Sequence, residues 1–131
     1  MSSEVGSRTS SAAIRKIWLY WESRGRGAEP PHIAFCRQTA ERKAGVPVEI
    51  VTPASLRDYL PGISSNIDRI VHEDRPQKHC IGIKSVFIRA FILEKYGGLF
   101  LDSDALVLQD LHEVFDAVET HGFVCTQRST P

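Results

Sequence analysis

The most informative part of the sequence is Tyr96-Gly97-Gly98-Leu99-Phe100-Leu101-Asp102-Ser103-Asp104. Two glycines end a long apolar segment with helical spacing, a three-residue apolar run follows them, and two carboxylates close the stretch. This order is typical of a helix-to-strand connection in an α/β domain. Ligands of open α/β sheets gather at the carboxyl ends of the strands, and the two carboxylates stand at such an end.

The two carboxylates predict a cation site. Residues i and i+2 of an extended segment point the same way, so Asp102 and Asp104 are expected to face one site while Ser103 turns aside. Two close carboxylates repel each other unless a cation lies nearby, and Mg²⁺ and Mn²⁺ are commonly held by carboxylates together with substrate phosphates. Asp and Ser are also the usual turn formers, so a plain acidic turn is the alternative interpretation.

The residues before this stretch extend the pattern to a family. Lys84-Ser85-Val86-Phe87-Ile88-Arg89, followed by Glu94-Lys95-Tyr96-Gly97-Gly98-Leu99-Phe100-Leu101-Asp102-Ser103-Asp104, resembles the sugar-binding region of Asp-x-Asp glycosyltransferases. The similarity is strongest to the capsular-polysaccharide-synthesis and mannosyltransferase-like group, to which the large clostridial glucosylating toxins are related. It extends over roughly residues 14–125 and covers only the amino-terminal half of the family's catalytic domain.

The resemblance implies a GT-A-like α/β fold, with a Rossmann-like, mostly parallel sheet flanked by helices. It implies metal-dependent transfer of a sugar from a nucleotide-sugar donor to a hydroxyl acceptor, such as a glycan or capsular polysaccharide, with retention of configuration. In this sequence Asp102 and Asp104 would hold Mn²⁺ or Mg²⁺, and Arg89 would contact sugar or phosphate. Ser85, one turn before Arg89, would lie on the donor side of the helix, and Trp21 would stack on the base.

Two of these assignments have a structural alternative. Trp18 is expected to be a core residue of the first strand, whereas Trp21 adjoins the polar loop 22–27 and suits either the core or a base. Arg89 is also suited to an ion pair with Asp102 or Asp104, because a buried arginine needs an anionic partner.

Val86 departs from the family pattern, which has Asp at this place to hold sugar hydroxyls. Valine accepts no hydrogen bond, so donor binding is expected to be altered or lost. A degenerate or truncated, non-catalytic nucleotide-sugar-binding domain is therefore the alternative function. A metal phosphohydrolase-like domain is a third, although the extra acids and histidines expected for two metals are missing.

The remaining sequence predicts one domain, residues 14–131, behind a disordered tail, residues 1–13. The helix before the glycine pair is expected to be buried, because it is apolar on most sides. Expected strands cover residues 14–21, 46–51, 99–101, 105–108 and 123–125. Expected helices cover residues 32–43, 52–59 with Thr52 as the N-cap, 63–72 and 79–96, with a loop or short amphipathic helix at 110–118.

Composition limits the other possibilities. Lys plus Arg equals Asp plus Glu at 16 each, and no basic tract is present, which gives no support for nucleic-acid binding. The three cysteines form no Cys-x-x-Cys pair, so neither a disulfide framework nor a zinc site is indicated. The lack of a secretory or membrane-spanning apolar run predicts a cytoplasmic protein, and peripheral association with the inner membrane face is left open. Self-association through an exposed sheet edge or face is expected of a truncated sheet.

Overall fold

A parallel β-sheet forms the centre of the computed structural model, which describes residues 14–23, 29–69 and 80–122. Strand β1 (Ile17–Tyr20) lies between β2 (Val48–Val51) and β3 (Leu99–Phe100), in the order β2-β1-β3. Ile17 is in register with Val48 on one side and with Leu99 on the other. The predicted α/β class with a Rossmann-like parallel sheet is therefore confirmed. The predicted tail and the predicted strand at residues 123–125 lie outside the described residues.

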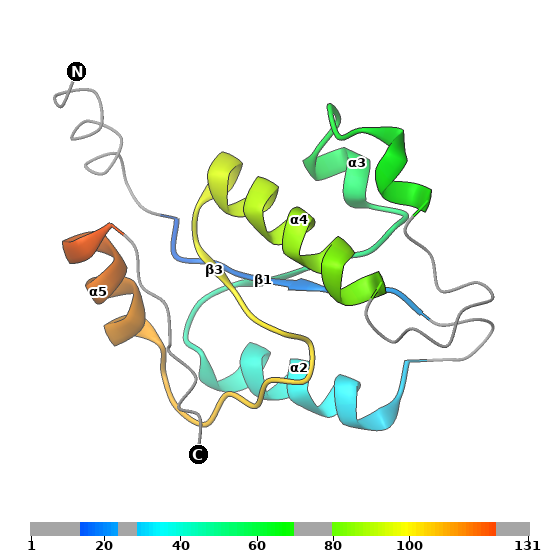
Figure 1. Ribbon diagram of the computed structural model, residues 1–131. Coiled ribbons are helices and arrows are strands. Elements are labelled where there is room, and N and C mark those ends of the chain that lie inside the picture. The colour runs from blue at the N-terminus through cyan, green and yellow to red at the C-terminus, as the bar shows by residue number, and fades with distance from the viewer. Residues whose placement is uncertain (1–13, 24–28, 70–79, 123–131) are drawn as a thin grey trace, which may run out of the picture.

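Helices cover both faces of this sheet. Helix α2 (Pro31–Lys43) lies on one face and α4 (Cys80–Tyr96) on the other, with the short α3 (Leu56–Tyr59) and the 3₁₀ helix η1 (Ser65–Arg69) on the α4 side (Figure 1). Side chains of β1 alternate between these faces. Trp18 and Tyr20 pack with Ile88 and Ile92 of α4, while Ile17 and Leu19 pack with the α2 side.

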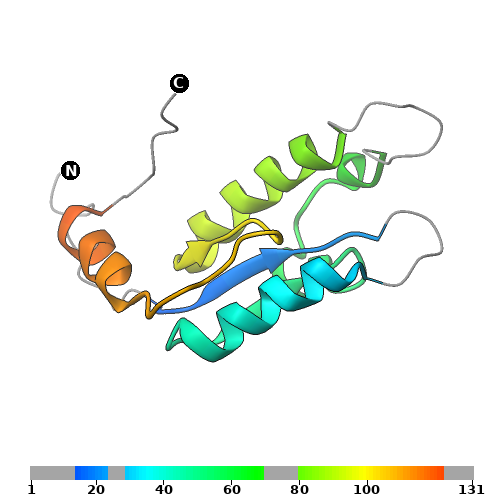
Figure 2. The same ribbon diagram turned by 90° about the horizontal axis from the view of Figure 1, so that it is seen from below.

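Helix α5 (His112–His121) lies beyond the amino end of β1, far from the end where α2 begins (Figure 2). Its buried Phe115 joins the core on the α2 side. Arg15, just before β1, binds Asp116 and Glu119 of this helix at 2.6 and 2.9 Å. The expected short amphipathic helix is thus confirmed, and it lies at the end of the sheet opposite the carboxyl ends of the strands.

The glycine pair ends α4 as predicted. Gly97 has φ +74 and donates its N–H to the carbonyl of Leu93 at 2.9 Å, so it satisfies a carbonyl of the last helical turn. Gly98 has φ +97 and lies against the backbone of Lys16, whose carbonyl accepts the N–H of Leu99 at 2.9 Å. Helix end and strand start are thus only two residues apart.

Two of the expectations about helix and strand positions are wrong. Thr52 is not an N-cap, because Thr52 and Ser55 hydrogen-bond to each other in a turn and α3 begins only at Leu56. Residues 105–108 do not form a strand, because the N–H of Val107 donates to Thr39 Oγ1 on α2 at 3.0 Å instead of to a neighbouring strand. Of the helix expected at residues 63–72, the described part is the 3₁₀ helix η1.

The expectation that the helix before the glycine pair is buried on most sides is also wrong. Among residues 83–96 of α4, for which burial is described, only a narrow stripe with Lys84, Ile88 and Ile92 is buried against the sheet. A helix resting on one face of a sheet buries only the side that touches it. The apolar side chains on its outer side are about half exposed, namely Ile83, Val86, Phe87 and Phe91.

None of the helices in the described part of the chain combines the length and the hydropathy that crossing a membrane requires.

Candidate functional site

Asp102, Ser103 and Asp104 form a turn at the carboxyl end of the sheet. The strand β3 ends at Phe100, and the N–H of Ala105 donates to the carbonyl of Asp102 at 3.0 Å, which closes a four-residue turn. Both carboxylates are exposed. The sequence predicted that Ser103 turns aside from the carboxylates, and its hydroxyl in fact donates to the backbone carbonyl of Tyr20. This hydrogen bond connects the turn of residues 102–105, called the acidic turn below, to the last residue of β1.

Arg89 of α4 fastens the same turn from the other side. Its Nη2 lies 2.8 Å from Asp102 Oδ1, and its guanidinium lies 5.2 Å from the centroid of the Phe100 ring. The ion pair that the sequence left open as an alternative is therefore present. The Asp102 side chain is still 70% exposed, so it has room for a second ligand. Arg89 Nε is buried and has no hydrogen-bond partner among the described residues.

A buried ion pair that the sequence did not predict lies next to the end of β1. Lys84 Nζ is 3.0 Å from Glu22 Oε2, and the two side chains are only 3% and 15% exposed. The sequence places Glu22 in the polar loop 22–27, and it assigns no role in the site to Glu22 or to Lys84. The available signal was the spacing of Lys84, Ile88 and Ile92, which places a lysine on the stripe of the helix that is otherwise apolar.

Tyr20 belongs to the same cluster. Its hydroxyl donates to Glu22 Oε2 at 2.8 Å. Burial in the core and the hydrogen bond to the Glu22 carboxylate both raise the pKa of Tyr20 above its ordinary value. The phenol is therefore neutral and available as a donor throughout the physiological range.

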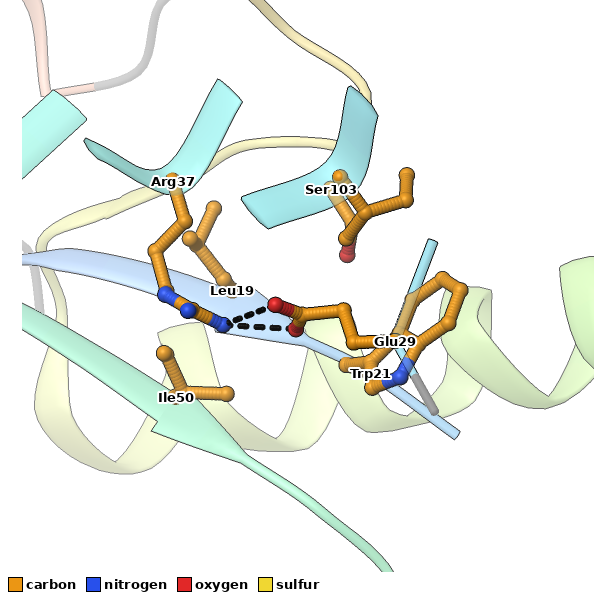
Figure 3. Close-up of a pocket in the computed structure, with 7 residues that line it drawn as sticks. Leu19, Trp21, Glu29, Arg37, Ile50 and Ser103 are labelled. Carbon is orange, nitrogen blue, oxygen red and sulfur yellow. Dashed lines mark hydrogen bonds and ion pairs between the residues drawn. The ribbon is translucent and has the colours of Figure 1, made fainter. Parts of the chain in front are cut away.

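Trp21 points to the opposite face of the sheet from Glu22. It lines a shallow depression together with Leu19, Ile33, Ile50, Glu29, Arg37 and Ser103 (Figure 3). Arg37 Nη1 lies 2.6 Å from each carboxylate oxygen of Glu29 at the edge of this depression (Figure 3). The indole N–H of Trp21 is buried and lacks a hydrogen-bond partner within the described residues.

The other tryptophan and Ser85 complete the predicted set. Trp18 is a core residue, as expected, and donates its indole N–H to the carbonyl of Gly97 at 2.9 Å. Ser85 is partly buried on α4, four residues before Arg89. No described hydrogen bond or ion pair joins Ser85 to Asp102 or Asp104.

The donor set suits a hard cation only if a ligand completes it. No group of three His, Cys, Asp or Glu side chains that could hold a metal ion occurs in the described ranges. Asp102 and Asp104 would supply carboxylate oxygens, and Mg²⁺ in particular is commonly bound by one or two carboxylates with substrate phosphates and water. An incomplete, exposed pair of carboxylates therefore fits a metal that arrives with a phosphorylated ligand.

A family model described as "Capsular polysaccharide synthesis protein" matches residues 2–131 of the chain. This match agrees with the resemblance that residues 84–104 carry. No curated protein and no solved structure matches the chain.

Proposed function

The chain belongs to the capsular polysaccharide synthesis protein family, and on this premise we propose that it serves a glycosyltransferase reaction. The donor is a nucleotide sugar and the acceptor is a hydroxyl group of a growing glycan or capsular polysaccharide. The observation that carries the proposal is the acidic turn with Asp102 and Asp104 exposed at the carboxyl end of a parallel sheet, where α/β domains bind their ligands.

Each residue of the site has a role in this proposal. Asp102 and Asp104 would hold Mn²⁺ or Mg²⁺, and the metal would supply Lewis-acid stabilisation of the negative charge on the leaving nucleotide. Arg89 holds Asp102 in place and adds a positive charge beside the phosphates. Ser85 lies on the donor side of α4, and the Trp21 indole covers the base. The expected stereochemical outcome is retention, for which no protein base is assigned.

A degenerate, non-catalytic nucleotide-sugar-binding domain is the second candidate. Val86 favours it, because Val86 stands three residues before Arg89 and therefore beside it on the helix surface. The Val86 side chain is exposed and apolar at the place where the family pattern has an acid. A donor sugar that reached this position would find no hydrogen-bond acceptor.

Calorimetric titration of UDP and GDP into the purified chain tests the binding site. We expect binding of at least one nucleotide that requires Mn²⁺. In Asp102→Asn/Asp104→Asn the affinity is expected to fall by about 10- to 100-fold, because both metal-ligating carboxylates are removed.

The matched control is Asp116→Asn/Glu119→Gln, which removes two exposed carboxylates of α5 at the opposite end of the sheet. This control is expected to bind as the original chain does. Absence of binding by a folded, monodisperse chain, or equal loss in both double variants, would contradict the proposed site.

Val86→Asp separates the transferase from the degenerate domain. If the chain lacks only this acceptor, the variant is expected to bind a nucleotide sugar about 10- to 150-fold more tightly, since a hydrogen bond to a charged group contributes about 1.5–3 kcal/mol. Donor affinity and donor hydrolysis are measured together. The matched control is Ile83→Asp, which places the same acid on the same helix at a similarly exposed position one turn earlier. No gain over the original chain, or the same gain in the control, means that Val86 does not stand at a sugar contact.

A further inference from the structure

The ion pair between Lys84 and Glu22 is expected to add little net stability where it lies. Lys84 stands on the buried stripe of α4, whose neighbours Ile88 and Ile92 are fully buried. Glu22 meets it with both oxygens, at 3.0 and 3.2 Å. Burying two charges costs about as much as their attraction returns, and well-packed apolar residues often stabilise a protein equally well. Stability alone therefore gives no reason for a charged pair at this place.

The position of the Lys84–Glu22 pair, close to the candidate site, gives a reason for having charged residues there. Glu22 follows the end of β1, and Lys84 lies on α4 five residues before Arg89. Arg89 binds Asp102 of the acidic turn, and Ser103 of the same turn donates to the carbonyl of Tyr20. The Tyr20 hydroxyl in turn donates to Glu22.

Together with the backbone of β1, of the acidic turn and of α4, these contacts form a closed circuit, which we call the site circuit. It runs from β1 to the acidic turn, from the turn to α4, and from α4 back to β1. Its members are Tyr20, Glu22, Lys84, Arg89, Asp102 and Ser103. The circuit joins segments that are 62 and 83 residues apart in the sequence at Glu22–Lys84 and at Tyr20–Ser103.

We propose that Lys84 and Glu22 are positioning residues, which hold the acidic turn and Trp21 at a fixed separation. Glu22 is the neighbour of Trp21, so anchoring its side chain to α4 also sets the backbone from which the indole projects to the other face. Lys84 sets the same backbone relative to the helix that carries Arg89. The inference rests on the proposed function, in that the acidic turn and Trp21 are taken to bind the two ends of one nucleotide.

The test uses Lys84→Met/Glu22→Gln in the full chain. This double variant removes both charges together, so no unpaired charge is buried, and Gln keeps an acceptor for the Tyr20 hydroxyl. The Mn²⁺-dependent affinity for UDP and GDP is expected to fall by about 10- to 100-fold, the usual effect of losing a residue that orients a ligand-binding group. The control is Ile88→Val, which weakens packing on the same stripe of α4 outside the circuit.

A second measurement does not depend on nucleotide binding. The N–H of Ala105 closes the acidic turn, so its hydrogen-exchange rate reports how firmly the turn is held. We expect faster exchange at Ala105 in the double variant, with the rate unchanged in Ile88→Val. If the double variant does not fold, Tyr20→Phe removes the hydrogen bond that orients the Glu22 carboxylate while leaving the ion pair with Lys84 and the contact of Ser103 with the backbone of residue 20 in place, and it is expected to speed exchange at Ala105 to a smaller extent.

The outcomes distinguish the two proposals. If the original chain binds neither nucleotide, the proposed function fails, and exchange at Ala105 still decides whether the pair positions the turn. A folded double variant with the original exchange rate at Ala105 overturns the positioning role. So does equal loss of affinity in Ile88→Val, which would mean that any weakening of α4 has the same effect.

Discussion

Lys84→Met is expected to lower the free energy of unfolding by about 3–5 kcal/mol, the cost of leaving one partner of a buried ion pair uncompensated. Glu22 would keep its hydrogen bond from the Tyr20 hydroxyl, but it would lose its cation in a place where its side chain is only 15% exposed. A domain of this size has a total stability of about 5–15 kcal/mol, so the loss is a large fraction of it. Urea unfolding followed by far-UV circular dichroism measures the change.

Two further variants distinguish the cost of leaving a buried charge unpaired from the cost of losing an ion pair in general. Lys84→Met/Glu22→Gln is expected to recover most of the stability, because it leaves no charge unpaired. Arg57→Met breaks the exposed pair with Asp68, which is closer at 2.6 Å, and is expected to cost no more than about 1 kcal/mol. A cost for Lys84→Met as small as that for Arg57→Met would show that Glu22 does not depend on Lys84.

Gly98→Ala is expected to destabilise the domain by about 2–6 kcal/mol, the sum of two effects. At φ +97 a residue with a β-carbon is strained by about 1–3 kcal/mol. The added carbon would also lie 2.7 Å from the carbonyl oxygen of Lys16, which is backbone and cannot swing away, and such overpacking costs about 1–3 kcal/mol more. The clash pushes β3 away from β1 and thereby moves the acidic turn.

Two other glycines, Gly97 and Gly62, provide matched controls for this substitution. Gly97→Ala meets the same kind of backbone strain, at φ +74, but nothing lies within 4 Å of the added carbon. It is expected to cost only about 1–2 kcal/mol. Gly62→Ala has neither a positive φ nor a contact and is expected to be close to neutral. Equal effects at Gly97 and Gly98 in thermal unfolding would mean that the contact with Lys16 does not limit the fold.

Much of the architecture is determined locally and was therefore open to prediction. The apolar run of β1, the proline that opens α2 and the glycine pair that ends α4 act through neighbours only a few residues away. The acidic turn belongs to this group, because its position after β3 follows from the order of the chain. The ion pair between Arg89 and Asp102, at a separation of 13 residues, was within reach as an alternative.

Other features depend on which segments meet in space, and these were missed or predicted wrongly. The apolar run after Asp104 is typical of a strand, but the N–H of Val107 donates to Thr39 of α2, which lies 68 residues away in the sequence. The apolar spacing of α4 shows how many of its side chains are hydrophobic, and it does not show how much sheet is present to cover them. Four of its apolar side chains therefore remain about half exposed, namely Ile83, Val86, Phe87 and Phe91.

The candidate site likewise has one part that local sequence determines and another that tertiary packing determines. Local sequence places Asp102, Asp104 and Arg89 at the carboxyl end of the sheet, because each stands at a fixed distance from the glycine pair. The partner of Lys84 was not predictable from its neighbours in the sequence, because Glu22 lies 62 residues away and local sequence does not indicate which acid a helical lysine will contact. Only the packing of α4 across the end of β1 brings Glu22 to Lys84. Because both side chains have low exposure there, removing one of the two charges is expected to destabilise the fold far more than removing both.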